Sequence, residues 1–243
     1  MPIVTTIEGR IAQVAIDRPE KRNTLSSELC KDLAREFLEL NDDTRVRSIV
    51  LCGHNNVFCA GLDIEEQLAE NTPIFNEFQK VIDALDALSK PVVAAVSGPA
   101  VSQGAAMLYH CDLVFAGEHA LFSMPGLALG QTPRYGVSLL AVKSGGYKLA
   151  AQKLLLSEPI SAAEAVAMGL VNHIVEDDKV MTVAGAAALR LAATKRLLKA
   201  AYMSGLSEQR KLEEEAASHL EGSAESKEAF SAFMEKRQPK FAE

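Results

Sequence analysis

The sequence has no excess of positive charge, and this excludes one large class of partners. Its 25 Lys and Arg residues are outnumbered by 32 Asp and Glu, so the formal net charge at pH 7 is -7. A nucleic-acid partner is not expected, because binding to a phosphate backbone needs a basic surface. A small anionic ligand needs only a few local Lys or Arg and is compatible with this balance.

Paired cysteines, a leader segment and a long apolar run are also absent. The four cysteines, Cys30, Cys52, Cys59 and Cys111, form no CxxC pair and no cluster with histidine, which predicts buried free thiols rather than metal ligands. The sequence shows no signal peptide and no run of about 20 apolar residues, the length that a membrane span requires. These absences predict a protein of the reducing cytoplasm, with no membrane partner and no bound metal.

The sequence does contain an alternation of short apolar runs and amphipathic stretches. The apolar runs are predicted as strands over residues 11–16, 46–51, 92–96, 113–116, 120–123 and 170–175. Apolar residues at helical spacing predict helices over residues 25–41, 64–68, 75–88 and 103–109. From about residue 186 the pattern is helical alone, with breaks near Gly205 and Gly222. The sequence therefore predicts an α/β core over residues 1–185 and a helical segment over residues 186–243.

Two glycine-bearing turns after buried strands form the best candidate site. Strand 92–96 runs into Ser97-Gly98-Pro99, and Ser102-Gln103-Gly104 then opens a helix whose first amides lack intrahelical acceptors. Such amides can donate to a developing oxyanion. Strand 46–51 leads to Cys59-Ala60-Gly61-Leu62, where glycine permits close backbone approach. Either turn alone is also typical of a connection without chemistry.

Taken in order, these turns and several other stretches resemble the crotonase superfamily of enoyl-CoA hydratases and isomerases. The resemblance covers nearly the whole chain and includes Phe58-Cys59-Ala60-Gly61-Leu62-Asp63-Ile64 and Ala95-Val96-Ser97-Gly98-Pro99-Ala100. Further matching stretches are residues 17–25, 111–116, 127–130, 162–165, 169–171 and 232–241. The segments Gly98-Pro99-Ala100 and Leu129-Gly130-Gln131-Thr132-Pro133 are most similar to the branch that moves an enoyl-CoA double bond.

The resemblance implies a spiral of ββα units, with a helical C-terminal segment that helps trimers to form or covers the site. It implies a fatty acyl-CoA (enoyl-CoA) thioester as substrate, with coenzyme A as part of that substrate and no separate cofactor. It also implies a homotrimer or a dimer of trimers. The backbone amides of Leu62 and Gln103 would form an oxyanion hole for the enolate. Contacts with coenzyme A are implied for a wider set: Lys21, Arg22, Ala60, Leu62, Asp63, Ile64, Phe233 and Lys236.

The chain departs from this family at the residues that move protons. Hydratases use two glutamates, whose positions are occupied by Ala106 and Gly126, and the isomerases use one, whose position is occupied by Arg134. None of these three side chains accepts a proton at neutral pH. Water addition or double-bond migration by the usual base is therefore not expected.

Three interpretations of the missing carboxylates follow. The chain is an enzyme of the family that works through its oxyanion hole, or it decarboxylates or hydrolyses a carboxylated acyl thioester held by Arg134, or it binds acyl-CoA without turnover. A surface or inter-subunit salt bridge is the commoner role for such an arginine. Tyr135 and His110 lie near the site in sequence and are expected to be structural, and Asp63 and Asp112 are expected to make capping or turn bonds.

Overall fold

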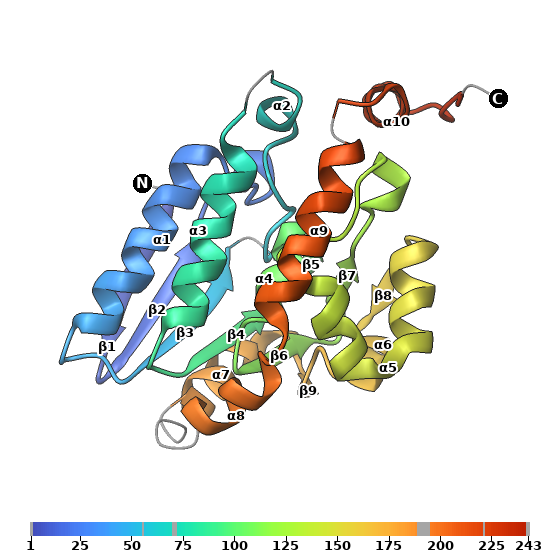
Figure 1. Cartoon of the computed structure of the whole chain (residues 1–243). Coiled ribbons are helices and arrows are strands. Elements are labelled where there is room, and N and C mark those ends of the chain that lie inside the picture. Colours follow the sequence, from blue (N-terminus) through green and yellow to red (C-terminus); the bar gives the residue numbers. More distant parts are fainter. Residues whose placement is uncertain (1, 55, 70–71, 189–194, 221, 242–243) are drawn as a thin grey trace.

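The structure, a computed structural model, describes residues 2–54, 56–69, 72–188, 195–220 and 222–241. Its centre is a six-stranded sheet in the order β1-β2-β3-β4-β6-β9 (Figure 1). The strands are β1 (Ile3–Glu8), β2 (Ile11–Ile16), β3 (Ser48–Gly53), β4 (Val92–Val96), β6 (Leu113–Gly117) and β9 (His173–Val175). β1 pairs antiparallel with β2, and all later neighbours are parallel. The inner strands are continuous apolar runs because both of their faces are buried.

Helices cover both faces of this sheet. α1 (Ser27–Asp42) and α3 (Ile74–Ala87) pack on one face, and α7 (Val180–Ala188) packs on the other. Alternate residues of β4 point to the two sides: Val92, Ala94 and Val96 join the core under α1 and α3, and Val93 and Ala95 join the core under α7. The predicted boundary between residues 185 and 186 falls inside α7, which belongs with the sheet because its small apolar residues fill that face.

The chain also forms a smaller sheet with the strand order β5-β7-β8, and it follows a spiral path by alternating between the two sheets. Its strands are β5 (Pro99–Val101), β7 (Leu121–Ser123) and β8 (Ile160–Ser161). The chain passes from β4 to β5 and from β6 to β7, and in each pair the first strand belongs to the large sheet and the second to the small sheet. The first pair is followed by α4 (Gln103–Leu108) and the second by α5 (Val137–Leu155). This arrangement confirms the predicted α/β class with a spiral of ββα units.

The C-terminal segment is helical, as predicted. It contains α8 (Lys195–Tyr202), α9 (Leu206–Leu220) and α10 (Ala224–Met234), and Figure 1 shows α9 running from α8 toward α10 near the C-terminus. Gly205 and Gly222 separate these helices, both with positive φ, which glycine adopts without strain. Residues 189–194 of the predicted helical segment lie outside the described residues. Within the described chain, no helix is both long and apolar enough to cross a bilayer.

The sequence patterns missed or misplaced several elements. The expected turn at Gly98-Pro99 leads directly into β5, the strand predicted over residues 170–175 is only the short β9, and β1 was not predicted. α5 was also missed, because Leu149 and Leu155 are exposed while Leu140 is buried, so no one-sided apolar pattern marks this helix. The remaining elements are α2 (Ile64–Gln67), α6 (Ala162–Ala167), η1 (Pro19–Lys21), η2 (Leu127–Leu129) and η3 (Asp177–Lys179).

Candidate active site

Backbone hydrogen bonds bring the two predicted glycine turns side by side. Cys59 forms a parallel bridge with Ala100 of β5, and the N–H of Val101 donates to the Cys59 carbonyl at 2.8 Å. On its other side the same turn is held by Leu25, whose N–H donates to the Gly61 carbonyl at 2.9 Å. The segment around Leu62 is therefore fixed between β5 and the start of α1.

Glycine is required where these segments touch. A Cβ atom at Gly98 would overlap the carbonyl oxygen of Asn56, and one at Gly104 would overlap the carbonyl oxygen of Cys59. Any larger residue at either position would push the two turns apart. The glycine pattern in the sequence thus marks a close backbone contact.

The amides of Leu62 and Gln103 are two donors without a backbone acceptor in the described chain. Gln103 is the first residue of α4, and within the described chain its N–H has no backbone acceptor and no side-chain cap. The Leu62 N–H donates to the Oε1 atom of the Gln103 side chain at 3.4 Å, and both residues are buried. The structure therefore places both predicted oxyanion-hole residues together, with the Gln103 carboxamide at the Leu62 amide.

Ser102, which leads into these donors, has a strained backbone. Its φ of 52° and ψ of -116° lie in a region that residues with a side chain rarely adopt. Such a conformation costs on the order of 1–3 kcal/mol and persists only where the surroundings impose it. Ser102 immediately precedes the first turn of α4, whose residue Gln103 contacts the Leu62 N–H.

A small cavity lies beside Gln103. It has a volume of about 50 Å³ and is lined by Gln103, Ala106, Gly126 and Arg134, among others. No Asp, Glu, His or Lys of the described chain lines it. Burial raises the pKa of the neighbouring Cys59 thiol to about 12, so this group stays protonated at neutral pH. The cavity is polar at Gln103 and Arg134 but contains no general base.

A larger cavity of about 600 Å³ opens between α2, α3, α9 and α10. The two cavities share Gln131, Thr132 and Arg134 in their linings. The Arg134 guanidinium pairs with the Glu214 carboxylate of α9 at 3.6 Å and lies over the Phe75 ring, whose centroid is 4.7 Å from Cζ. Arg134 thus forms a salt bridge within the chain and also borders both cavities.

The next residue, Tyr135, is packed into the core, as expected. It has a φ of 65°, is buried, and contacts Phe78 edge-to-face with 4.8 Å between ring centroids. Its carbonyl lies 3.0 Å from Nε2 of His110, and Nδ1 of that ring lies 2.9 Å from the Asp86 carboxylate. Both partners of the ring, one at each nitrogen, carry acceptor oxygens. His110 therefore has the structural role expected of it, because its ring supports the loop that carries Arg134.

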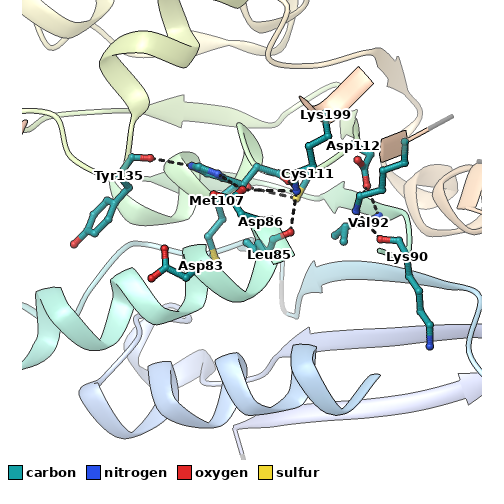
Figure 2. Close-up of polar contacts among 12 residues, drawn as sticks. Asp83, Leu85, Asp86, Lys90, Val92, Met107, Cys111, Asp112, Tyr135 and Lys199 are labelled. Carbon is teal, nitrogen blue, oxygen red and sulfur yellow. Dashed lines mark hydrogen bonds and ion pairs between the residues drawn. The ribbon is translucent and has the colours of Figure 1, made fainter. Parts of the chain in front are cut away.

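Asp86 connects this loop to the C-terminal helices (Figure 2). Its carboxylate is 2.6 Å from Nη2 of Arg210 on α9 and 3.6 Å from Nζ of Lys199 on α8. Burial raises the pKa of Asp86, but the hydrogen bond and charge of His110 and the charges of both cations hold it below its ordinary value overall. Sequence reasoning missed Asp86, because its three cationic partners lie 24 to 124 positions away.

The two aspartates singled out by the sequence make the structural bonds expected of them. Asp63 caps α2 by accepting from the Glu65 N–H at 3.1 Å, and it pairs with Arg18 at 3.2 Å. Asp112 accepts from the Val92 N–H at 2.7 Å and pairs with Lys195 at 2.8 Å. Figure 2 shows this second group at the start of β4.

Most residues implied in coenzyme A binding lie together around the turn that holds Leu62. The Ala60 N–H donates to the Arg22 carbonyl at 3.2 Å, and Lys21 pairs with Glu65 on α2 at 3.2 Å, next to Ile64. Phe233 and Lys236 belong to the end of α10 and the residues just after it, and both are exposed. Within the described chain, no hydrogen bond or ion pair joins these two to the first group.

Comparisons with known proteins agree with this arrangement. A family model described as enoyl-CoA hydratase/isomerase matches residues 6–243. A short-chain-enoyl-CoA hydratase of Clostridium acetobutylicum is 31% identical to this chain, and the match covers 97% of this chain and 95% of the hydratase. A 2,3-dehydroadipyl-CoA hydratase of Escherichia coli K12 is 30% identical over 98% of each chain. The crystal structure of an enoyl-CoA hydratase/isomerase from Pseudoalteromonas atlantica superposes with a TM-score of 0.92 at 32% identity, covering 100% of both chains. The chain therefore belongs to the enoyl-CoA hydratase/isomerase family.

Proposed function

We propose that the protein binds an acyl-CoA thioester and stabilises its enolate with the backbone amides of Leu62 and Gln103. The observation that carries this proposal is the contact between two buried residues, Leu62 and Gln103, whose N–H groups have no backbone acceptor in the described chain; Gln103 also lines a cavity. Fixed donors stabilise the charge that develops on a carbonyl oxygen, and they gain strength in a site that excludes water.

Coenzyme A would lie along the turn that holds Leu62. Lys21 and Arg22 lie beside this turn and supply positive charge for the phosphates. Lys21 already pairs with Glu65, so a phosphate must compete with that carboxylate. Weakened affinity for free coenzyme A, or a pantetheine carried on a protein, is consistent with this competition. Phe233 and Lys236 contribute only if α10 meets a bound coenzyme A in the assembled protein.

The lining of the small cavity argues against hydration by the usual mechanism. A general base or acid contributes about a hundredfold to ten-thousandfold in rate, and Ala106 and Gly126 supply neither. The chemistry that the site supports is one in which the enolate forms without a protein carboxylate as base. The oxyanion hole is then the whole catalytic contribution of the backbone.

Arg134 favours a second candidate, the decarboxylation of a carboxylated acyl thioester. Its side chain is only 12% exposed and borders both cavities, and its partner Glu214 is 67% exposed and can be solvated by water instead. A substrate carboxylate beside Arg134 would leave as CO2, the electrons of the broken C–C bond passing into the thioester as an enolate. Water would then protonate the α-carbon. Leu62 and Gln103 would hold the enolate oxygen until that step.

The test separates these activities with defined substrates. Wild type is expected to bind crotonyl-CoA and to hydrate it at close to the background rate. Ala106→Glu supplies a carboxylate in the cavity and is expected to raise hydration at least about a hundredfold. The proposal is wrong if no acyl-CoA binds at all, or if wild type hydrates crotonyl-CoA as fast as Ala106→Glu.

Release of CO2 from malonyl-CoA by wild type, and its loss in Arg134→Gln, would establish the second candidate. Isomerisation of 3-hexenoyl-CoA by wild type would instead require a base that lies outside the cavity. Binding without any turnover in these assays would identify an acyl-CoA-binding protein.

We also propose that the protein forms trimers or dimers of trimers. Apolar side chains of α5 and the residue after it are exposed in the single chain: Val142, Tyr147, Leu149, Leu155 and Leu156. A large apolar surface of this kind is normally covered by a partner. Sedimentation equilibrium gives the mass directly, and a monomer at micromolar concentration would contradict this proposal.

A further inference from the structure

We propose that the Gln103 side chain sets the affinity of the oxyanion hole for thioesters by occupying the hole itself. This inference rests on the proposed function and deepens it. The Gln103 carboxamide oxygen lies 3.4 Å from the Leu62 nitrogen and so accepts from one of the two donors that a thioester carbonyl would use. The acyl carbonyl therefore competes with a group of the protein and not only with water.

The surroundings hold the carboxamide in this place. Gln103 is only 6% exposed, and Leu62 is 1% exposed. A Cβ atom at Gly61 would lie 3.2 Å from Gln103 Oε1 and 3.2 Å from the Val101 carbonyl oxygen, so the carboxamide fits closely against the turn. The internal acceptor thus satisfies a buried amide that would otherwise be left without a partner.

The internal bond is weak enough to be exchanged. At 3.4 Å it is longer than the usual range of about 2.7–3.2 Å for N–H···O bonds, whereas a thioester carbonyl is free to approach at the ordinary distance. The exchange also leaves the backbone in place, because Gln103 supplies its own N–H as the second donor from the start of α4. Only the side-chain torsions of Gln103 must change.

The displaced carboxamide can move into the small cavity that Gln103 lines. The cavity of about 50 Å³ is lined by Gln103, Ala106 and Gly126, where the hydratases would have their carboxylates. A cavity of this size holds only a few water molecules, because each needs at least about 10–15 Å³ of cavity volume. A carboxamide that moves there takes up part of the space beside the acyl α-carbon. Gln103 therefore weakens thioester binding and restricts the acyl group at the same point.

The experiment compares two coenzyme A ligands that carry the same four-carbon group, of which only one has the thioester carbonyl. Butyryl-CoA and its thioether analogue, S-butyl-CoA, are titrated calorimetrically into wild type and Gln103→Ala, with free coenzyme A as a third ligand. A net hydrogen bond contributes about 1 kcal/mol, which is roughly a fivefold change in affinity. The ratio of thioester to thioether affinity is expected to rise roughly fivefold in Gln103→Ala. The extra space that the variant creates affects the binding of both ligands alike and therefore cancels in the ratio of their affinities.

Two further variants make the test specific. Gln103→Glu places a carboxylate at the Leu62 N–H, where a charged acceptor binds about twice as strongly, so the ratio is expected to fall below that of wild type. Gln131→Ala removes a glutamine from the same cavity without freeing the Leu62 amide, so it should change both affinities alike.

The outcomes distinguish this inference from the function on which it rests. A ratio that is equal in wild type and Gln103→Ala, with coenzyme A still bound, overturns the role of Gln103 and leaves acyl-CoA binding intact. A ratio that rises equally in Gln131→Ala also overturns it, because space alone would then explain the gain. Failure of all three ligands to bind either protein overturns both proposals.

Discussion

Replacing Asp86 by Asn should destabilise the protein more than any other single change on α3 that preserves size. The carboxylate lies 2.9 Å from His110, 2.6 Å from Arg210 and 3.6 Å from Lys199. The Asp86 side chain is 19% exposed, so these contacts are partly shielded from water. The single negative charge therefore ties α3 to the end of α4, to α8 and to α9.

The magnitude follows from the bonds that the amide cannot replace. Hydrogen bonds to charged groups contribute about 1.5–3 kcal/mol each, and breaking a fully buried ion pair costs about 3–5 kcal/mol. The Asp86→Asn variant keeps one acceptor oxygen but removes the charged acceptor of His110 and leaves Arg210 paired with the exposed Asp83. We expect a loss of about 3 kcal/mol in the free energy of unfolding. At this chain length the melting temperature should fall by about 6–12 °C.

Asp83→Asn provides the matched control. Asp83 lies one turn earlier on α3 and also pairs with Arg210, at 3.1 Å, but its side chain is 57% exposed. An exposed pair contributes about 0–1 kcal/mol, so this variant should remain close to wild type. Urea unfolding of the three proteins at one protein concentration measures the difference, because oligomers couple stability to concentration. Equal stabilities of Asp86→Asn and Asp83→Asn would refute the reasoning.

The pH dependence of the Asp86 effect has a definite sign. Burial raises the pKa of Asp86 in the folded protein, but interactions with His110, Lys199 and Arg210 outweigh this effect, so the pKa is lowered overall. The stabilisation is therefore fully present above the ordinary carboxyl pKa of about 3.9 and is lost as pH falls through the folded value. The difference between wild type and Asp86→Asn should be constant from about pH 7 to 5 and should shrink below about pH 4.

Three further predictions follow from local geometry. Ser102→Gly should stabilise the protein by about 1 kcal/mol in urea unfolding, because glycine adopts the strained φ of 52° freely; a loss of stability would show that no strain is stored there. Gly104→Ala should cost about 3 kcal/mol and abolish acyl-CoA binding, because its Cβ overlaps the Cys59 carbonyl; a variant with normal stability and binding would contradict the close contact. The exposed His119 has a raised pKa through its hydrogen bond and charge interaction with Asp177, so His119→Gln should lower the melting temperature below pH about 6.5. That difference should vanish as pH rises through the folded pKa, and a difference that grows with pH would have the wrong sign.

The sequence alone determined the features that depend on short segments. Residues 92–96 are a strand in a parallel sheet because five consecutive apolar residues between Pro91 and Gly98 satisfy burial on both faces. Ser161 and Glu164 form the capping box that their spacing predicts. The absence of carboxylates at Ala106 and Gly126 is equally a fact of sequence, and the structure adds that both line one small cavity.

Only the tertiary structure decided which distant groups meet. The Gln103 side chain reaches the Leu62 amide because β5 pairs with Cys59, and that register is set by the spiral as a whole. Glu213 accepts from the N–H of Ser138 at the start of α5, although 75 positions separate the two residues. Side-chain bonds of this kind carry no periodic signal in the sequence, because the two partners are selected by the packing of separate elements. For the same reason the sequence predicted the segments of Leu62 and Gln103 as a candidate site, whereas the contact of the Gln103 carboxamide with the Leu62 amide is apparent only in the folded chain.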